Sequence, residues 1–374
     1  MSQNFQNHIN TTTSCHCEEG TTEAINRKKH LVWIASFLAM TSCLLVSCEK
    51  EIEFKGEQTD PRLVINSVVE PGQPIWARIS KSIFFLDNSN DTEAPADLVA
   101  TLYVNGNRIG EMTPKIDTIW ETEYPWVIEP TYRLWKTYAH PYCPSVGDEV
   151  KITASANGFD DVEGSTGTIP NHTACQIKDI RLIEDESWAY TDDFGDTTDR
   201  YCSYTYELSL EVTDPHAGKV DFFKLGIDDN YHYLDGYDHY NFYSFASISD
   251  YSDPVFGAVS STNIDFIDYQ MSEPNSTFTD LLFDGRSYTI KVPIRFFYFT
   301  TIEGLEPDAC PIAVYVEHIT KDYYNYLNTC EQGDGDASFF SEPIQTHTNV
   351  NGGYGIVGGR SVDTLWVALP LEEK

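Results

Sequence analysis

Cys48 is the residue whose neighbours most clearly predict a chemical reaction, the attachment of lipid to its thiol. The three residues before it match a lipobox, an aliphatic residue followed by two small or apolar ones: Leu45, Val46 and Ser47. Upstream lie basic residues at 27–29 and an uncharged, mostly apolar run at 31–46, which is the pattern of a secretory signal peptide. We therefore expect residues 1–47 to be a leader that a signal peptidase removes. Each buried CH₂ of an acyl chain on Cys48 would add roughly 0.8 kcal/mol to membrane binding, so several chains would anchor the protein firmly.

Two other interpretations of this segment stay open. Cys43 is a rival modification site, although it lies inside the apolar run and the residues before it match the lipobox less well. An uncleaved membrane anchor is the second, although the charges at 49–51 follow before a full span is completed. Residues 48–60 form the expected tether. Its beginning, residues 49–53, resembles the acidic, lysine-containing export signal of Bacteroidetes surface lipoproteins and is equally well explained as a solvated linker.

The chain is strongly acidic, with 58 Asp and Glu against 24 Lys and Arg among 374 residues and a formal charge of -34. This charge argues against nucleic acid as a partner, because phosphates must be met by Lys and Arg. It also keeps the body of the protein away from anionic lipid headgroups. Aromatic residues make up 13% of the chain, whereas a disordered acidic chain would be poor in them. The length that follows Cys48 therefore favours two folded domains.

Short β-rich segments separated by turn residues predict an all-β fold of two β-sandwich-like domains. In residues 61–170 the run Leu98–Val104 leads into Asn105-Gly106 and a second apolar run, which is the strongest short-range signal for a hairpin. We expect this first domain to be immunoglobulin-like. Residues 171–374 form the second expected β domain, which carries long acidic and aromatic loops.

The clearest alternation of apolar and polar residues lies in the second domain. Five large apolar side chains would point to one face of a strand: Tyr204, Tyr206, Leu208, Leu210 and Val212. A period of two indicates a strand with one buried and one wet face. One short helix is predicted near 320–330, where Thr320 can cap the N-terminus and apolar residues recur at helical spacing.

Five cysteines follow the lipidation site: Cys143, Cys175, Cys202, Cys310 and Cys330. An oxidising envelope permits pairing, but an odd number leaves at least one free thiol, and connectivity does not follow from sequence. A disulfide between Cys310 and Cys330 is the first expectation, because the short helix could fold one back toward the other. Buried, unpaired thiols are the alternative.

Two loops contain side chains that could bind a ligand. The first mixes aromatic rings with a carboxylate, a combination that suits a carbohydrate or peptide ligand: Tyr231, Tyr233, Asp235, Tyr237 and Tyr240. Packing of these rings onto the sheet explains the same residues more simply. The second, Asp334-Gly335-Asp336, could hold calcium, but it lacks the spacing and terminal Glu of an EF-hand loop, which favours a plain acidic turn. We therefore expect no metal and no other cofactor.

The sequence contains none of the common catalytic motifs. It has no His-Glu-x-x-His helix, no Gly-x-Ser-x-Gly elbow, no phosphate-binding glycine loop before a Lys, and no Cys-x-x-Cys. With ten His and 58 carboxylates, some neighbouring pairs arise by chance. We therefore expect no enzymatic activity, and an envelope hydrolase is kept as an alternative.

The C-terminal part carries a family resemblance. Residues 340–344, followed by the glycine-rich run at 348–359, resemble the ending of a Bacteroidetes lipoprotein family known as domain of unknown function 4249 (DUF4249). The segment Leu63–Asn66 and the turn at Pro71-Gly72 resemble the start of that family. The resemblance covers nearly the whole mature chain, whose tyrosine-rich insertions are unusually long. It implies a lipoprotein that partners an outer-membrane TonB-dependent receptor, with no assigned reaction or catalytic residues.

The glycines of this run also have a structural explanation. Gly352 and Gly353 can take positive φ in a turn, and the later glycines permit a bulge or close backbone approach. Taken together, these features predict a non-enzymatic outer-membrane lipoprotein, anchored at the cell surface, that helps a TonB-dependent nutrient receptor. A structural or adhesive envelope protein is the main alternative.

Overall fold

The computed structural model describes residues 60–83, 92–121, 131–191, 197–214, 216–227, 242–257, 276–301, 309–334 and 346–370. Within these residues the chain is built mostly from strands, which confirms the predicted all-β class. The helical segments described are α2 (Pro254–Gly257), the 3₁₀ turn η2 (Asp280–Leu282) and α3 (Lys321–Asp334). No helix among the described residues is long and apolar enough to cross a membrane.

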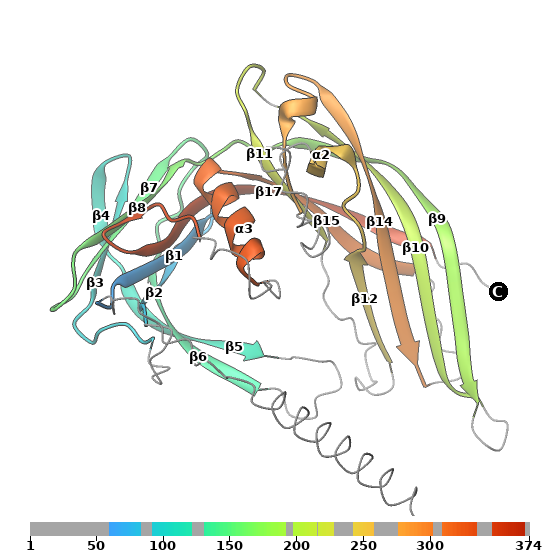
Figure 1. Ribbon diagram of the computed structural model, residues 1–374, viewed down its shortest axis with the longest axis horizontal. Coiled ribbons are helices and arrows are strands. Elements are labelled where there is room, and N and C mark those ends of the chain that lie inside the picture. Colours follow the sequence, from blue (N-terminus) through green and yellow to red (C-terminus); the bar gives the residue numbers. More distant parts are fainter. Residues whose placement is uncertain are drawn as a thin grey trace, which may run out of the picture. The chain divides into compact units, whose positions relative to one another are not determined.

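The described strands form three sheets (Figure 1). The first has eight strands, in the order β13 (Thr277–Thr279), β11 (Phe222–Ile227), β15 (Ala309–Ile319), β17 (Tyr354–Pro370), β1 (Leu63–Val69), β2 (Ile75–Lys81), β6 (Thr131–His140) and β5 (Thr113–Glu121). The second has four, in the order β12 (Phe242–Ile248), β14 (Ser287–Thr300), β10 (Thr197–Thr213) and β9 (Ala174–Thr191). The third has five, in the order β16 (Val350–Asn351), β8 (Val162–Thr168), β7 (Glu149–Ser155), β3 (Val99–Val104) and β4 (Asn107–Glu111).

Two hydrophobic cores make the structure sandwich-like, and the eight-stranded sheet contributes to both. One core joins the inner face of β10 and β14 to β11 and β15, with Tyr206, Phe223 and Phe296 fully buried. The other joins β1 and β2 to the five-stranded sheet, with Ile65, Leu102 and Ile152 fully buried. A sandwich of this kind forms because each sheet must bury its apolar face against another element.

The predicted boundary near Pro170 falls between β8 and β9. The eight-stranded sheet contains strands from both sides of it, because β17 from the end of the chain pairs in parallel with β1 from its beginning. The division into two domains stays a prediction, and this shared sheet connects the two halves.

Local signals predicted several elements correctly. β3 and β4 form the expected hairpin, and Asn105 and Gly106 have φ of 49° and 77°, as a primed turn requires. The alternation in β10 is also confirmed, since all five large apolar side chains from Tyr204 to Val212 are at most 6% exposed. Pro293 lies in the interior strand β14 just beyond the end of β12, where Ser249 N donates to its carbonyl oxygen. The nitrogen and carbonyl of one strand residue face the same neighbour, so the missing N–H of Pro293 lies on the β12 side, past the last paired residue of that strand, and no bond to β10 is lost.

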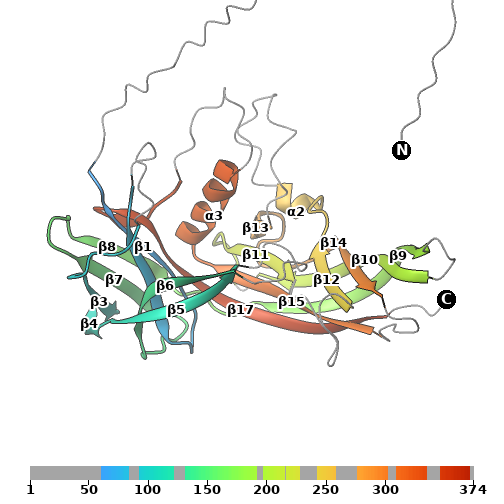
Figure 2. The ribbon, with the colours of Figure 1, turned by 90° about the horizontal axis from the view of Figure 1, so that it is seen from below.

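α3 confirms the predicted helix, although it extends four residues past the expected end at Cys330. Thr320 connects it to β17, because its hydroxyl oxygen accepts from Gly359 N at 3.1 Å and its own N–H donates to Gly359 O at 2.9 Å. Figure 2 shows α3 against the sheet that contains β17. Tyr323 packs where Gly358 leaves room, since a Cβ there would lie 2.8 Å from Tyr323 Cβ.

The predicted disulfide is not formed, because Cys330 is a free, half-buried thiol on α3. The side chain of Cys310 lies outside the described residues, but its strand position explains the result. From Cys310 to Ile319 the extended chain covers about 30 Å at ~3.3 Å per residue. The helix returns only about 14 Å by Cys330 at ~1.5 Å per residue. The two Cα atoms therefore cannot approach within the roughly 7 Å that a disulfide requires.

Candidate functional site

The outer face of the four-stranded sheet is the best candidate for a functional surface. Strand pleating turns alternate residues of β10 and β14 away from the core, so that Ser203 and Thr205 share the outer face with Arg295. β9 extends this face on the other side of β10, since Glu186 pairs with Ser203 and Glu184 pairs with Thr205. Side chains far apart in sequence thus meet on one polar surface.

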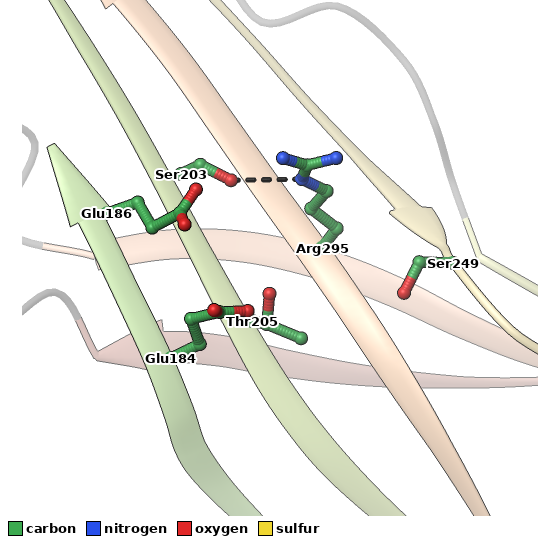
Figure 3. A pocket seen from close by; sticks show the side chains of 6 residues that line it. All are labelled: Glu184, Glu186, Ser203, Thr205, Ser249 and Arg295. Carbon is green, nitrogen blue, oxygen red and sulfur yellow. Dashed lines mark hydrogen bonds between the residues drawn. The ribbon is translucent and has the colours of Figure 1, made fainter. Parts of the chain in front are cut away.

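These side chains line a cavity of about 300 Å³ (Figure 3). Hydroxyl, carboxylate and guanidinium groups surround it: Glu184, Glu186, Ser203, Thr205, Ser249 and Arg295. Arg295 Nε donates to Ser203 Oγ at 3.0 Å, and this bond holds the guanidinium over the sheet. Its two terminal nitrogens form no ion pair within the part of the chain that the structure describes. They stay available to a ligand.

The charges around the cavity can recognise a polar ligand from two sides. Arg295 offers a planar set of N–H donors that fits a carboxylate or adjacent hydroxyl groups. Glu184 and Glu186 are exposed acceptors for hydroxyl or amine groups. A small molecule or chain with both donors and acceptors would therefore suit the cavity.

A strip of aromatic rings continues the same outer face next to the cavity. We call it the aromatic strip; it consists of Tyr201, Phe245, Phe297 and Phe299, all only partly buried. The ring of Tyr201 lies 4.8 Å from that of Phe299 and 6.3 Å from that of Phe297, centroid to centroid. Phe245 lies 5.3 Å from Phe297. Partly exposed rings beside hydrogen-bonding groups are typical of surfaces that bind sugars, peptides or other proteins.

The residues that the sequence predicted as functional lie, apart from Asp334, outside the described part of the chain. Cys48 and the lipobox residues Leu45, Val46 and Ser47 lie outside the described residues. The tyrosine-rich loop also lies outside them: Tyr231, Tyr233, Asp235, Tyr237 and Tyr240. Asp334 is the last residue of α3, and the rest of the predicted acidic turn is outside the described range. The structure tests none of these three predictions.

The cavity and the aromatic strip were missed by sequence reasoning, although one signal pointed to them. The alternation in β10 identified a wet face containing Thr205. The pairing partners of that face could not be predicted, because the register between β9, β10 and β14 is set by long-range packing.

Comparison with known proteins identifies the family of this chain. A family model described as "Domain of unknown function (DUF4249)" matches residues 49–365, which includes every strand of the candidate site. No curated protein matches the chain.

Proposed function

Because the chain belongs to the DUF4249 family, we propose that it is a non-enzymatic lipoprotein of a Bacteroidetes outer membrane that binds a ligand for a TonB-dependent nutrient receptor. The lipobox at Cys48 supports anchoring through acyl chains. The acidic, lysine-containing tether after Cys48 supports exposure at the cell surface. The family resemblance supports the receptor as partner.

The observation that carries the binding role is the outer face of the four-stranded sheet. Arg295 presents unpaired donors beside two exposed carboxylates, and the aromatic strip lies on the same strands. Stacking on the rings and hydrogen bonding in the cavity would together hold a carbohydrate or a short peptide. Catalysis has less support, because the described residues that line the cavity include no imidazole to activate a nucleophile and no thiol to act as one.

The binding role is tested with the full-length chain, purified in detergent, on arrays of polysaccharide fragments and peptides. We expect one ligand class to bind, and we expect Arg295→Ala and Phe297→Ala each to weaken it at least about tenfold, or about 1.4 kcal/mol. Lys291→Ala is the matched control. It removes one positive charge from the same face of β14, away from the cavity. Equal losses in Arg295→Ala and Lys291→Ala would show that only net charge matters and would reject this site.

The uptake role is tested in the producing bacterium. Deletion of the gene should impair growth on the nutrient that carries the bound ligand, and the chain should recover a TonB-dependent receptor from solubilised outer membranes. Failure of both results would refute the receptor partnership. Loss of surface attachment with normal import would favour the adhesive alternative, and substrate turnover by the purified chain would favour the hydrolase.

Lipidation is tested separately by mass spectrometry of the native protein. The N-terminal residue should be Cys48 carrying acyl chains, and Cys48→Ala should release the chain from membranes. A native product without acyl groups would remove the basis for anchoring.

A further inference from the structure

Three buried aspartates lie together at one end of the sandwich, away from the candidate site. Asp214 follows β10, Asp221 precedes β11, and Asp280 begins η2 after β13. Their side chains are 6%, 2% and 1% exposed, respectively. One carboxylate oxygen of each lies within 4.8 Å of the others. We call this group the aspartate cluster.

Two of the three carboxylates are held in place by donors outside the cluster. Asp214 Oδ1 accepts from His216 N at 2.8 Å, and its Oδ2 accepts from Gly285 N. Asp221 Oδ2 lies 2.7 Å from His216 Nδ1, and its Oδ1 lies 3.5 Å from His318 Nε2. Fixed carboxylates with such outer partners are typical of metal ligands, whose orientation is set before the ion arrives.

Asp280 differs, because one of its oxygens has no partner among the described residues. Its Oδ2 is buried and accepts no hydrogen bond from them, although the side chain is almost completely enclosed. An unpaired buried carboxylate is costly unless a cation or a proton meets it. Burial raises the pKa of Asp280, and the negative charges of Asp214 and Asp221 raise it further against the lowering effect of backbone hydrogen bonds.

We propose that the aspartate cluster binds a divalent cation with a preference for hard oxygen ligands, specifically Ca²⁺. Ca²⁺ bonds to oxygen at about 2.3–2.6 Å, so it can touch oxygens up to about 5 Å apart, which covers the whole spacing of the cluster. Mg²⁺ bonds to oxygen at about 2.0–2.1 Å, so two oxygens that it bridges can lie at most about 4.2 Å apart, which is less than the 4.8 Å limit of the cluster. The cation would be the partner of Asp280 Oδ2 that no described residue supplies.

Other charges near the cluster leave room for this cation. Lys219 Nζ lies 3.3 Å from Asp221 Oδ1, but its side chain is 69% exposed and can move into solvent. His318 is 2% exposed and also contacts the carbonyl oxygen of Asn171 at 2.9 Å through Nδ1. The carbonyl oxygen accepts the proton of Nδ1–H, so a neutral ring has no proton on Nε2, which lies 3.5 Å from Asp221 Oδ1, and it places no positive charge beside the ion.

The bound ion would connect the two layers that enclose the core between β10 and β14 on one side and β11 and β15 on the other. Asp214 belongs to the end of the four-stranded sheet, whereas Asp221 and Asp280 flank β11 and β13 of the eight-stranded sheet. Calcium should therefore stabilise the packing of one sheet on the other and raise the melting temperature of the chain.

The test is a calorimetric titration of CaCl₂ into the full-length, chelator-treated chain in detergent, with KCl present to suppress binding to the acidic surface. We expect one site with a Kd of roughly 10⁻³ M or tighter and a calcium-dependent rise in melting temperature. Asp280→Asn should weaken binding at least about tenfold. Asp161→Asn is the matched control, since it removes one carboxylate from an exposed position and should bind calcium as the wild type does.

A proton on Asp280 could neutralise the buried carboxylate in place of a cation. The stability of Asp280→Asn with and without calcium separates the two cases. Without calcium, Asp280→Asn should be more stable than the wild type if the site needs a cation, because the substitution removes the charge that has no partner. With saturating calcium this order should reverse. Absence of a binding signal up to about 10 mM Ca²⁺, an order of magnitude above the weakest protein sites, would overturn the proposal. Equal affinity in Asp280→Asn and the wild type would overturn it as well.

Discussion

Replacing Gly355 by alanine tests the parallel pairing of β1 and β17, on which the eight-stranded sheet depends. Gly355 is the register partner of Ile65 and has φ of 102°, a conformation that residues with a side chain rarely adopt. A Cβ at this position would overlap the carbonyl oxygen of Ile65. Ile65 is fully buried and belongs to the hydrogen-bonded ladder, so its backbone cannot move aside without loss of pairing.

The expected cost of Gly355→Ala combines two effects. The unfavourable φ costs about 1–3 kcal/mol, and the steric overlap with a packed backbone costs about 1–3 kcal/mol. A loss near 4 kcal/mol is a large share of the roughly 5–15 kcal/mol that stabilises a folded protein. At ~2.1 cal/mol/K per residue over roughly 310 residues, it lowers the melting temperature by about 6 °C.

Gly72→Ala is the control, because Gly72 also has positive φ, 77°, but a Cβ there would meet no atom within 4 Å. It should cost only the backbone term of about 1–2 kcal/mol, or about 2–3 °C. Both variants are measured by urea denaturation and differential scanning calorimetry of the full-length chain. Losses that agree within about 0.5 kcal/mol, the usual range for surface substitutions, would refute the steric argument and the close approach of the two strands.

Three further outcomes follow from buried groups. Arg360→Met removes the guanidinium 3.2 Å from the 2% exposed Glu317 and leaves only Lys224 Nζ, 3.8 Å away, as its cation among the described residues. It should therefore lower stability in urea denaturation by less than the roughly 3–5 kcal/mol of a fully uncompensated buried charge, and adding Glu317→Leu should restore most of the loss. Burial raises the pKa of Tyr204 to about 12. The stability that the neutral phenol contributes is therefore complete below about pH 10 and is lost as the pH rises from 10 to 12. Tyr204→Phe should weaken this alkaline loss of stability, which is followed by tyrosinate absorbance during unfolding. Burial, aided by a nearby carboxylate, raises the pKa of Cys175 to about 11, so iodoacetamide at about pH 8 should modify it much more slowly than the exposed Cys143 in peptide mass spectrometry. Equal modification of the two thiols would contradict the burial of Cys175.

Periodicity and turn chemistry along the sequence were sufficient to predict several local features. The alternation in β10 predicted which face is buried, and Asn105-Gly106 predicted a hairpin with positive φ at both residues. The helix after β15 was located to within one residue at its start. These predictions succeed because each depends on contacts between residues that are close in sequence.

The disulfide prediction was wrong because a disulfide depends on the distance between two Cα atoms in the fold, which a sequence pattern does not give. Proximity along the chain suggested that Cys310 and Cys330 could meet. The extended strand between Cys310 and Ile319 carries them further apart than the returning helix can recover.

The residues of the chain by themselves predicted the all-β class, the buried face of individual strands and the family to which the chain belongs. Lipid attachment at Cys48 stays a prediction from the lipobox. Three features follow only from the folded chain: β17 pairs with β1, Arg295 and Ser203 meet across β14 and β10, and Asp214 and Asp280 share a buried site. A strand's own residues specify which side is buried, but its partner and register depend on the packing of whole sheets. Sites assembled from several strands therefore become visible only when that packing is known.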